Sequence, residues 1–340
     1  MPGASFNVGD SPVGYAAVAG EGIETTTGGA GGSSRTIVDL PGLLDWARSR
    51  ENNVQAETVY LKGRFYSSST LMVMISRSAN ISILGLGEEA DLENIGLNLI
   101  SSHNIIIRNL KIHEVFWPGD AINIKASHHV WVDHCELYNK IGDSVAMNTY
   151  DGLIDINNNS SNITVSWCYL HDNIKTSLIG HADDPSLEKG DSRMRLTFHH
   201  NLFRRTAQRN PSIRYGAIHM FNNYFEDISD YGLASRLGAH AWLENNYYQD
   251  AKLAMTTENF KVKNRPHGFI CESGTEIRYS GGSDKAKATA EAKAQAKAIT
   301  QTGCDFWNSA SLPYTYHLDM ADSVPAAVKH GAGIGLVKGL

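Results

Sequence analysis

One short pattern recurs along the middle of the chain: an apolar strand, an Asn or small residue, and a second apolar strand. A weak copy lies at 81–85, and six clear copies follow at 105–112, 130–137, 163–170, 196–203, 218–225 and 242–248. The turn positions 85, 109, 135, 168, 201, 223 and 246 are separated by 24, 26, 33, 33, 22 and 23 residues. A period near 22 residues with insertions is typical of a solenoid in which each repeat forms one coil.

These repeats predict an all-β fold, a right-handed parallel β-helix, because the strands follow one another without helical patterns between them. Asn tolerates the left-handed backbone of a tight bend, and stacked Asn side chains can hydrogen-bond along the stack. A β-sandwich with Asn in ordinary turns is the alternative, but repetition of one pattern favours the β-helix. We expect one domain over 1–340, with coils over about 55–260 and a C-terminal loop and tail, 261–340, packing on them.

Both ends of the chain contain helical patterns. After a strand expected at 36–38, residues 39–49 form an amphipathic pattern with Leu43, Leu44 and Trp46 on or near its buried face. We expect this helix to cap the solenoid, since unpaired coil edges need covering. The Ala- and Lys-rich segment 283–299 is interpreted as an exposed helix or a mobile loop.

The four cysteines fall into two pairs. Cys135 and Cys168 occupy equivalent repeat positions, which places them about one strand spacing (~4.8 Å) apart. They could form stacked thiols or a disulfide, and we favour stacked thiols. Cys271 and Cys304 flank a polar segment and would pair in an oxidising compartment.

Composition narrows the classes of partner. The chain has 340 residues, 42% of them hydrophobic, and a formal net charge of −6, which argues against general nucleic-acid binding. No segment approaches the ~18 apolar residues of a membrane span. The N-terminal residues lack the basic and apolar regions of a signal peptide, so we expect a mature secreted chain, with a cytosolic protein as the open alternative.

Charged residues of both signs gather around the insertions between coils. The carboxylate pair Asp151 and Asp155 is followed by Lys175, and then by Arg209 and Arg214 on either side of Pro211. We place Asp151, Asp155 and Lys175 in the two long insertions, since loops on one side of a rigid scaffold commonly carry binding sites. Carboxylates that suit a hard cation, followed by three cations, indicate a metal-assisted site for an acidic polymer.

Five motifs, in this order, resemble the pectate lyases of polysaccharide lyase family 1. They are Val-Trp-Val-Asp-His at 130–134, Tyr-Asp-Gly-Leu-Ile-Asp at 150–155, Lys-Thr-Ser-Leu-Ile-Gly at 175–180, His-His-Asn at 199–201 and Arg-Asn-Pro-Ser-Ile-Arg at 209–214. The resemblance implies cleavage of α-1,4-linked galacturonate in pectate or pectin by β-elimination, in a groove formed by long loops. It also implies a secreted enzyme, expected to be a monomer without nucleic-acid or membrane partners.

The resemblance implies a calcium site. Asp120, Asp151 and Asp155 match the family's calcium carboxylates, and Ca²⁺ takes 6–8 oxygen ligands. The family often has a further acid where this chain has Pro118. The expectation is therefore a three-carboxylate site with weakened calcium binding in the free enzyme.

The resemblance also assigns the three cations. Arg209 matches the family's catalytic base, and Lys175 and Arg214 match substrate-binding cations. A guanidinium normally stays protonated, whereas nearby Ca²⁺ and Lys175 would favour its neutral form. Because the neutral fraction rises with pH, we expect an alkaline optimum.

Other polar groups are interpreted as structural. Asp133 and His134 stand at consecutive strand positions and are expected to point to opposite faces. His199 and His200 are interpreted in the same way, and 180–184 is assigned no chemistry. Two other functions are weighed: a calcium-independent pectin lyase for methyl-esterified polymer, and a non-catalytic carbohydrate-binding β-helix, both disfavoured by the retained charged residues.

Overall fold

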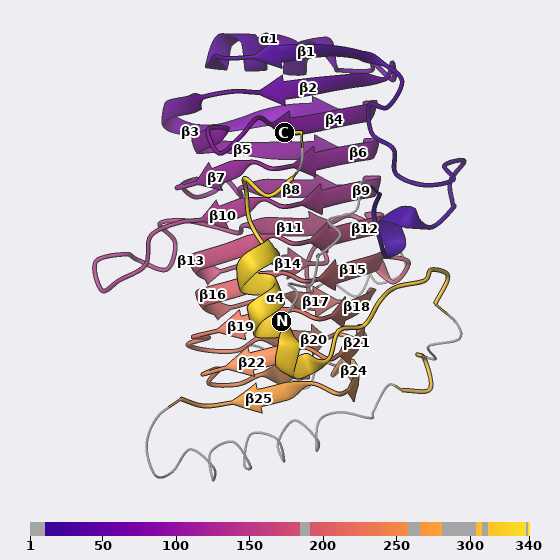
Figure 1. Ribbon diagram of the computed structural model, residues 1–340, viewed down its shortest axis with the longest axis vertical. Helices are drawn as coiled ribbons and strands as arrows, with labels where there is room; N and C mark the ends of the chain where they lie inside the picture. Colours follow the sequence, from indigo (N-terminus) through magenta and orange to yellow (C-terminus); the bar gives the residue numbers. More distant parts are fainter. Residues whose placement is uncertain (1–10, 184–190, 258–265, 281–303, 308–311, 338) are drawn as a thin grey trace, which may run out of the picture.

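Parallel strands stack into two long sheets along the axis of the molecule (Figure 1). The computed structural model describes residues 11–183, 191–257, 266–280, 304–307, 312–337 and 339–340. Within them the first sheet has ten strands: β1 (Ser33–Ile37), β2 (Glu57–Leu61), β4 (Ala79–Gly85), β6 (His103–Arg108), β9 (His128–Asp133), β12 (Ser161–Ser166), β15 (Arg195–His199), β18 (Ala217–Phe221), β21 (His240–Glu244) and β24 (Phe269–Ser273).

The second sheet consists of two arms that meet at β5 (Asp91–Ile100), which also pairs with β3 (Arg64–Ser76). The first arm contains β8 (Ile122–Lys125), β11 (Ile154–Asn157), β14 (Leu178–Ile179), β17 (Ser212–Arg214), β20 (Leu233–Arg236) and β23 (Met255–Thr256). The second arm contains β7 (Lys111–His113), β10 (Glu136–Tyr138), β13 (Tyr169–Lys175), β16 (Leu202–Gln208), β19 (Tyr224–Glu226), β22 (Tyr247–Gln249) and β25 (Glu276–Arg278).

Each coil contributes one strand to the first sheet and one to each arm. The strands β9, β10 and β11 form one such coil, and each pairs in parallel with its equivalent in the next coil: β12, β13 and β14. This arrangement confirms the right-handed parallel β-helix. The stacked strands continue to Arg278, past the expected boundary at residue 260.

The core is a stack of aliphatic ladders inside the coils. Inward positions of the first sheet carry pairs such as Ile105 and Ile107, and first-arm positions carry pairs such as Ile122 and Ile124, all with no exposed surface. Because strand residues alternate between two faces, the residue between each pair points out of the helix. The outward residues of the first arm therefore line one continuous surface.

A polar ladder continues the core at the turn after the first sheet. Asn201 Nδ2 donates to Asn223 Oδ1, and Asn223 Nδ2 donates to Asn246 Oδ1, both at 2.9 Å. This confirms the predicted stack of asparagines. The left-handed backbone lies one residue earlier than expected, at His200 (φ 54°) and Asn222 (φ 52°), so the ladder asparagines point inward while their predecessors form the bend.

The cysteines follow the preferred interpretation. Cys135 and Cys168 are buried free thiols that extend the ladder, with Cys168 N donating to Asn201 Oδ1 at 3.0 Å. Burial raises the pKa of the Cys168 thiol well above its ordinary value. Cys271 and Cys304 form a disulfide.

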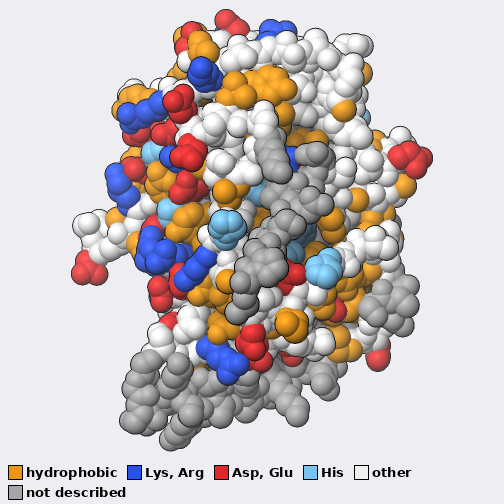
Figure 2. All heavy atoms as spheres, in the orientation of Figure 1, with side chains coloured by type: hydrophobic (Ala, Val, Ile, Leu, Met, Phe, Trp, Pro, Cys, Tyr) orange, Lys and Arg blue, Asp and Glu red, His pale blue; other side chains and the backbone are white. Residues whose placement is uncertain are grey.

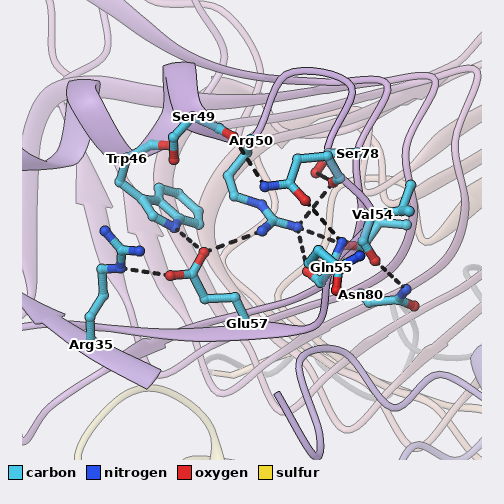
Figure 3. Close-up of polar contacts among 11 residues, drawn as sticks. Arg35, Trp46, Ser49, Arg50, Val54, Gln55, Glu57, Ser78 and Asn80 are labelled. Atoms are coloured by element: carbon cyan, nitrogen blue, oxygen red, sulfur yellow. Dashed lines mark hydrogen bonds and ion pairs between the residues drawn. The ribbon is translucent and has the colours of Figure 1, made fainter. Parts of the chain in front are cut away.

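Helix α1 (Leu40–Ser49) covers the N-terminal end of the coils, as expected (Figure 1). Its N-cap Asp39 accepts a hydrogen bond from Gly42 N at 2.8 Å, and Leu43 and Trp46 are buried against the coils. At its C-terminus Arg50, 1% exposed, pairs with Glu57 and donates to backbone carbonyls that include that of Gln55 (Figure 3). The cap is thus anchored by a buried ion pair as well as by apolar contacts.

The C-terminal segment packs along the outside of the coils. Helices η4 (Ala321–Ser323) and α4 (Val324–Gly331) lie across the second arm (Figure 1), where Val324 and Val328 pack on Tyr224. The N-terminal η1 (Tyr15–Ala17) contacts β9, β12 and β15. The predicted helix or loop at 283–299 lies outside the described residues.

The surface that carries α4 has charges of both signs beside one another (Figure 2). Glu226, for example, pairs with both Arg204 and Lys329. Among the described helices, none has the length and apolar character that a membrane span requires.

Candidate functional site

The charged motif residues converge on the outward face of the first arm. Asp120 lies two residues before β8, Asp155 lies in β11, and Arg214 ends β17. Lys175 ends β13, and Arg209 follows β16 at the neighbouring edge of the second arm. Segments almost 100 residues apart in sequence are thereby brought onto a few adjacent coils.

Asp120 and Asp155 face the same small space. A Cβ atom at Gly152 would lie 2.3 Å from Asp155 Oδ1 and 2.9 Å from Asp120 Oδ1, so only glycine leaves room between these two carboxylates. Gly152 N donates to Asp120 Oδ1 at 2.8 Å, and Leu178 N donates to Asp155 Oδ1 at 2.9 Å. Both carboxylates are at most 9% exposed and are held by backbone donors.

Burial and mutual repulsion disfavour the ionised form of both carboxylates. Burial, followed by the charge of Asp151, raises the pKa of Asp120 to about 6. Burial and the charge of Asp120 raise the pKa of Asp155 well above its ordinary value, although the Leu178 amide and the nearby Arg209 act in the opposite direction. Such an environment favours a bound cation, because the positive charge of the cation would offset the cost of ionising both carboxyl groups.

Asp151 lies beside this pair but is directed towards Lys175. The distance from Lys175 Nζ to Asp151 Oδ1 is 2.9 Å, and Lys175 Nζ also donates to Asn148 Oδ1 at 3.4 Å. Asn173 Nδ2 donates to the backbone oxygen of Asp151 at 3.1 Å, which holds this loop against β13. Lys175 and Asp151 therefore form a partly exposed ion pair at the edge of the carboxylate site.

The insertions carry less of the site than expected. Asp151 does lie in the loop before β11, but Asp155 and Lys175 lie on strands. The second long connection, between β14 and β15, instead contributes Asp183, whose Oδ1 lies 2.5 Å from Arg214 Nε. A residue of the segment to which no chemistry was assigned is therefore part of the site wall.

The arginines line a cavity of about 370 Å³, together with Asp183, Gln208, Asp230 and Tyr231. Arg209 and Arg214 lie there as expected from the motif. Arg214 is paired with Asp183, whereas the guanidinium of Arg209 has no hydrogen-bond or ion-pair partner among the described residues. Arg209 therefore offers an unengaged guanidinium beside the buried Asp155 carboxylate.

A third arginine, Arg236, was missed by the sequence reasoning. It is the register partner of Arg214 on the next coil, donates to Ser212 Oγ and is 7% exposed. Burial and the charges of Arg214 and Arg209 lower its pKa. Its spacing of 22 residues from Arg214 is one repeat period, which is the signal that could have identified it.

Asp133 and His134 form a buried structural network. The expectation that they point to opposite faces is wrong, because His134 has a left-handed backbone (φ 48°) that breaks the strand alternation. His134 Nδ1 lies 2.6 Å from Asp133 Oδ2, which also accepts from Arg108 Nε at 2.6 Å. Ser166 Oγ donates to Asp133 Oδ1, so this carboxylate is satisfied within the protein.

The donor chemistry of the carboxylate site suits a hard cation only in part. In the described portion of the chain, no three His, Cys, Asp or Glu side chains are arranged to hold a metal ion. Lys175 accounts for this, since it engages the third carboxylate, Asp151. Asp120 and Asp155 fit as ligands, and neutral oxygens nearby would have to complete the coordination.

Known proteins resemble this chain along almost its whole length. The family model described as pectate lyase matches residues 9–336. A pectate trisaccharide-lyase of Bacillus licheniformis is 35% identical over 316 residues, which cover 92% of this chain and 84% of the relative. Pectate lyase A of Aspergillus niger is 32% identical over 280 residues, covering 82% and 76% of the two chains.

Solved structures agree with this match. The crystal structure of a pectate lyase from Bacillus sp. N165, in complex with trigalacturonate, superposes with a TM-score of 0.78 at 30% identity. It covers 96% of this chain and 99% of the other. Pectate lyase II of Xanthomonas campestris has a TM-score of 0.77 at 23% identity, covering 95% and 98%, and supports the fold.

Proposed function

Because the chain belongs to the pectate lyase family and is a polysaccharide lyase, we propose that it cleaves α-1,4-linked polygalacturonate by calcium-assisted β-elimination. The unpaired Arg209 guanidinium, beside the buried Asp120–Asp155 pair and among further cations, carries this proposal. The relative of known structure that was solved with trigalacturonate supports an oligogalacturonate as the ligand.

The cations of the site would bind and orient an anionic sugar chain. Arg214, Arg236 and Lys175 offer donors on adjacent coils, and guanidinium groups match carboxylates in bidentate geometry. Arg214 and Lys175 are each held by an aspartate in the free protein, so substrate carboxylates would share or replace these partners. Polar groups held in this way keep the reacting carbons beside Arg209.

The reaction itself is a proton transfer and a bond cleavage. A nitrogen of the neutral Arg209 guanidine takes the proton from C5 of the sugar, and a double bond forms between C4 and C5. The bond from C4 to the glycosidic oxygen breaks, and that oxygen leaves with the electron pair and takes a proton from water. Asp120 and Asp155 would hold calcium, which when bound supplies positive charge for the enolate-like charge on the substrate carboxylate.

The pectin-lyase alternative is less well supported by the site. A neutral ester offers no charge to Arg214, Arg236 or Lys175, and a calcium-independent enzyme would have no use for two buried carboxylates whose pKa values are raised. A non-catalytic sugar-binding protein is disfavoured by the family and by the retained Arg209.

We also propose that the enzyme acts outside the cell as a monomer. The Cys271–Cys304 disulfide supports an oxidising compartment.

Product analysis of a polygalacturonate digest tests the proposal. Elimination gives oligosaccharides with a 4,5-unsaturated end, whose mass is lower by one water than that of the hydrolysis product. We expect mass spectrometry to find only unsaturated new ends, formed faster at alkaline than at neutral pH. Saturated new ends would identify a hydrolase and overturn the proposal.

A further inference from the structure

Asn123 lies beside the two buried carboxylates, Asp120 and Asp155. It lies on β8, its Cα is the register partner of Asp155 on β11, and both side chains are on the outward face. Its Nδ2 donates to Asp120 Oδ2. Adjacent strands are ~4.8 Å apart, so the Asn123 amide is within reach of both carboxylates.

The other end of this amide is unsatisfied. Asn123 is 8% exposed, and its Oδ1 is buried without a hydrogen-bond partner among the described residues. Buried polar atoms are nearly always paired, so an orphaned acceptor calls for an explanation such as an ion or water. The neighbouring charges are Asp120, Asp155 and, at longer range, Asp151, with Lys125 and Arg209 of opposite sign.

The missing partner has the chemistry of a cation. A hydrogen-bond donor would satisfy Oδ1 alone, whereas a hard cation would satisfy Oδ1 and offset the repulsion between Asp120 and Asp155. Calcium takes 6–8 oxygen ligands and accepts Asn carbonyl oxygens beside carboxylates. We propose that Asn123 Oδ1 is a ligand of the divalent cation held between Asp120 and Asp155; this rests on the calcium-assisted function proposed above.

The proposal gives Asn123 two ends with different tasks. Nδ2 orients the Asp120 carboxylate, and Oδ1 supplies a neutral oxygen ligand. The third carboxylate, Asp151, need not leave Lys175 for the cation to bind. Substitution by Asp separates the tasks, because it keeps an oxygen ligand but removes the donor to Asp120.

Calorimetric titration with Ca²⁺ after chelator treatment tests the assignment. The variants are Asn123→Ala, Asn123→Asp and, as a matched control, Asn98→Ala. Asn98 precedes Asn123 in the same outward column and also has a buried Oδ1 without a partner among the described residues. Each protein is titrated free and, in an Arg209→Lys background that spares the substrate, with saturating trigalacturonate.

We expect Asn123→Ala to weaken calcium binding by about 10–100-fold, Asn123→Asp to bind at least as tightly as the wild type, and Asn98→Ala to be unchanged. Wild-type affinity in Asn123→Ala would overturn the proposal, as would an Asn123→Asp variant as weak as Asn123→Ala. Either result would leave the lyase function intact if the wild type still forms unsaturated products. A wild type that binds no calcium in either titration would overturn the metal assignment as a whole.

Discussion

Arg209 is placed by its backbone rather than by its side chain. It has a left-handed backbone (φ 63°), its carbonyl accepts from Ser177 N at 2.7 Å, and the next residue, Asn210, donates from N to the Gly232 carbonyl at 3.0 Å. The single peptide that joins Arg209 to Asn210 is thus fixed to the coils on both sides. The guanidinium can be oriented towards substrate without an ion pair that would hold it in place.

An Arg209→Lys substitution should therefore affect the chemical step. Loss of a positioned general base typically costs about 10²–10⁴-fold in rate, and the retained positive charge should leave KM for polygalacturonate within about threefold. Initial rates at alkaline pH provide the measurement. The control is Arg204→Lys on β16, a half-buried arginine paired with Glu226 outside the site; equal losses in both variants would contradict the assignment.

Asp120 predicts a pH dependence of the calcium-free protein. Its pKa is about 6 in the folded state against an ordinary 3.8, so folding favours the protonated carboxyl. That contribution is present below about pH 4 and is lost as the pH rises through 6. One pKa unit corresponds to 1.36 kcal/mol, so the loss is on the order of 2–3 kcal/mol.

Urea unfolding in chelator at pH 4 and pH 7 measures this loss. We expect the unfolding free energy of the wild type to fall relative to Asp120→Asn between the two pH values, because the amide cannot ionise. Added calcium should restore the wild type at pH 7 but not the variant. The same change in unfolding free energy for both proteins would show that the surroundings of Asp120 do not disfavour its ionised form.

At the scale of the element, the cap and the coil turns depend on buried polar groups. Arg50 is enclosed beneath α1 by Glu57 and by three backbone carbonyls, those of Asn53, Gln55 and Ala79 (Figure 3). Removal of one partner leaves a buried charge unpaired. We expect Arg50→Ala to lower the unfolding free energy by about 3–5 kcal/mol.

Arg48→Ala is the matched control in the last turn of α1, because Arg48 pairs with Asp45 on the exposed surface. Such pairs contribute about 0–1 kcal/mol. Chemical denaturation of both variants distinguishes the two cases. A loss below about 1 kcal/mol for Arg50→Ala would mean that the cap tolerates removal of this ion pair.

Repeat spacing predicted the elements better than it predicted where their side chains point. The repeated apolar segments identified the strands, and the amphipathic pattern at 39–49 identified the capping helix, since burial of one face dictates both patterns. The left-handed position was predicted correctly at Asn109 but was placed one residue too late in the following coils, because the pattern does not distinguish the bend from the inward residue after it. The same bend turns His134 onto Asp133, against the alternation expected of a strand.

At the scale of the molecule, the site depends on stacking between coils. The motif identified Asp120, Asp155, Lys175, Arg209 and Arg214 as candidates, and the structure brings them onto neighbouring coils. Asn123 and Arg236 were missed, because their positions in the site come from the register between coils. Asn123 and Asp155 are 32 residues apart in sequence, and the pairing of β8 with β11 places them side by side. The ion pair between Asp151 and Lys175 could not be predicted, since sequence spacing does not show whether Asp151 binds a metal ion or a lysine.

The central claim is that this face of the coils eliminates across C4–C5 of polygalacturonate with the help of calcium. The most direct measurement is ultraviolet absorbance of the conjugated alkene formed at alkaline pH, with calcium and with chelator, for the wild type and Asp155→Ala. We predict a rise that needs calcium in the wild type and is absent or strongly reduced in the variant. A rise that is the same with chelator, or that survives in Asp155→Ala, would contradict a calcium-assisted site at these residues.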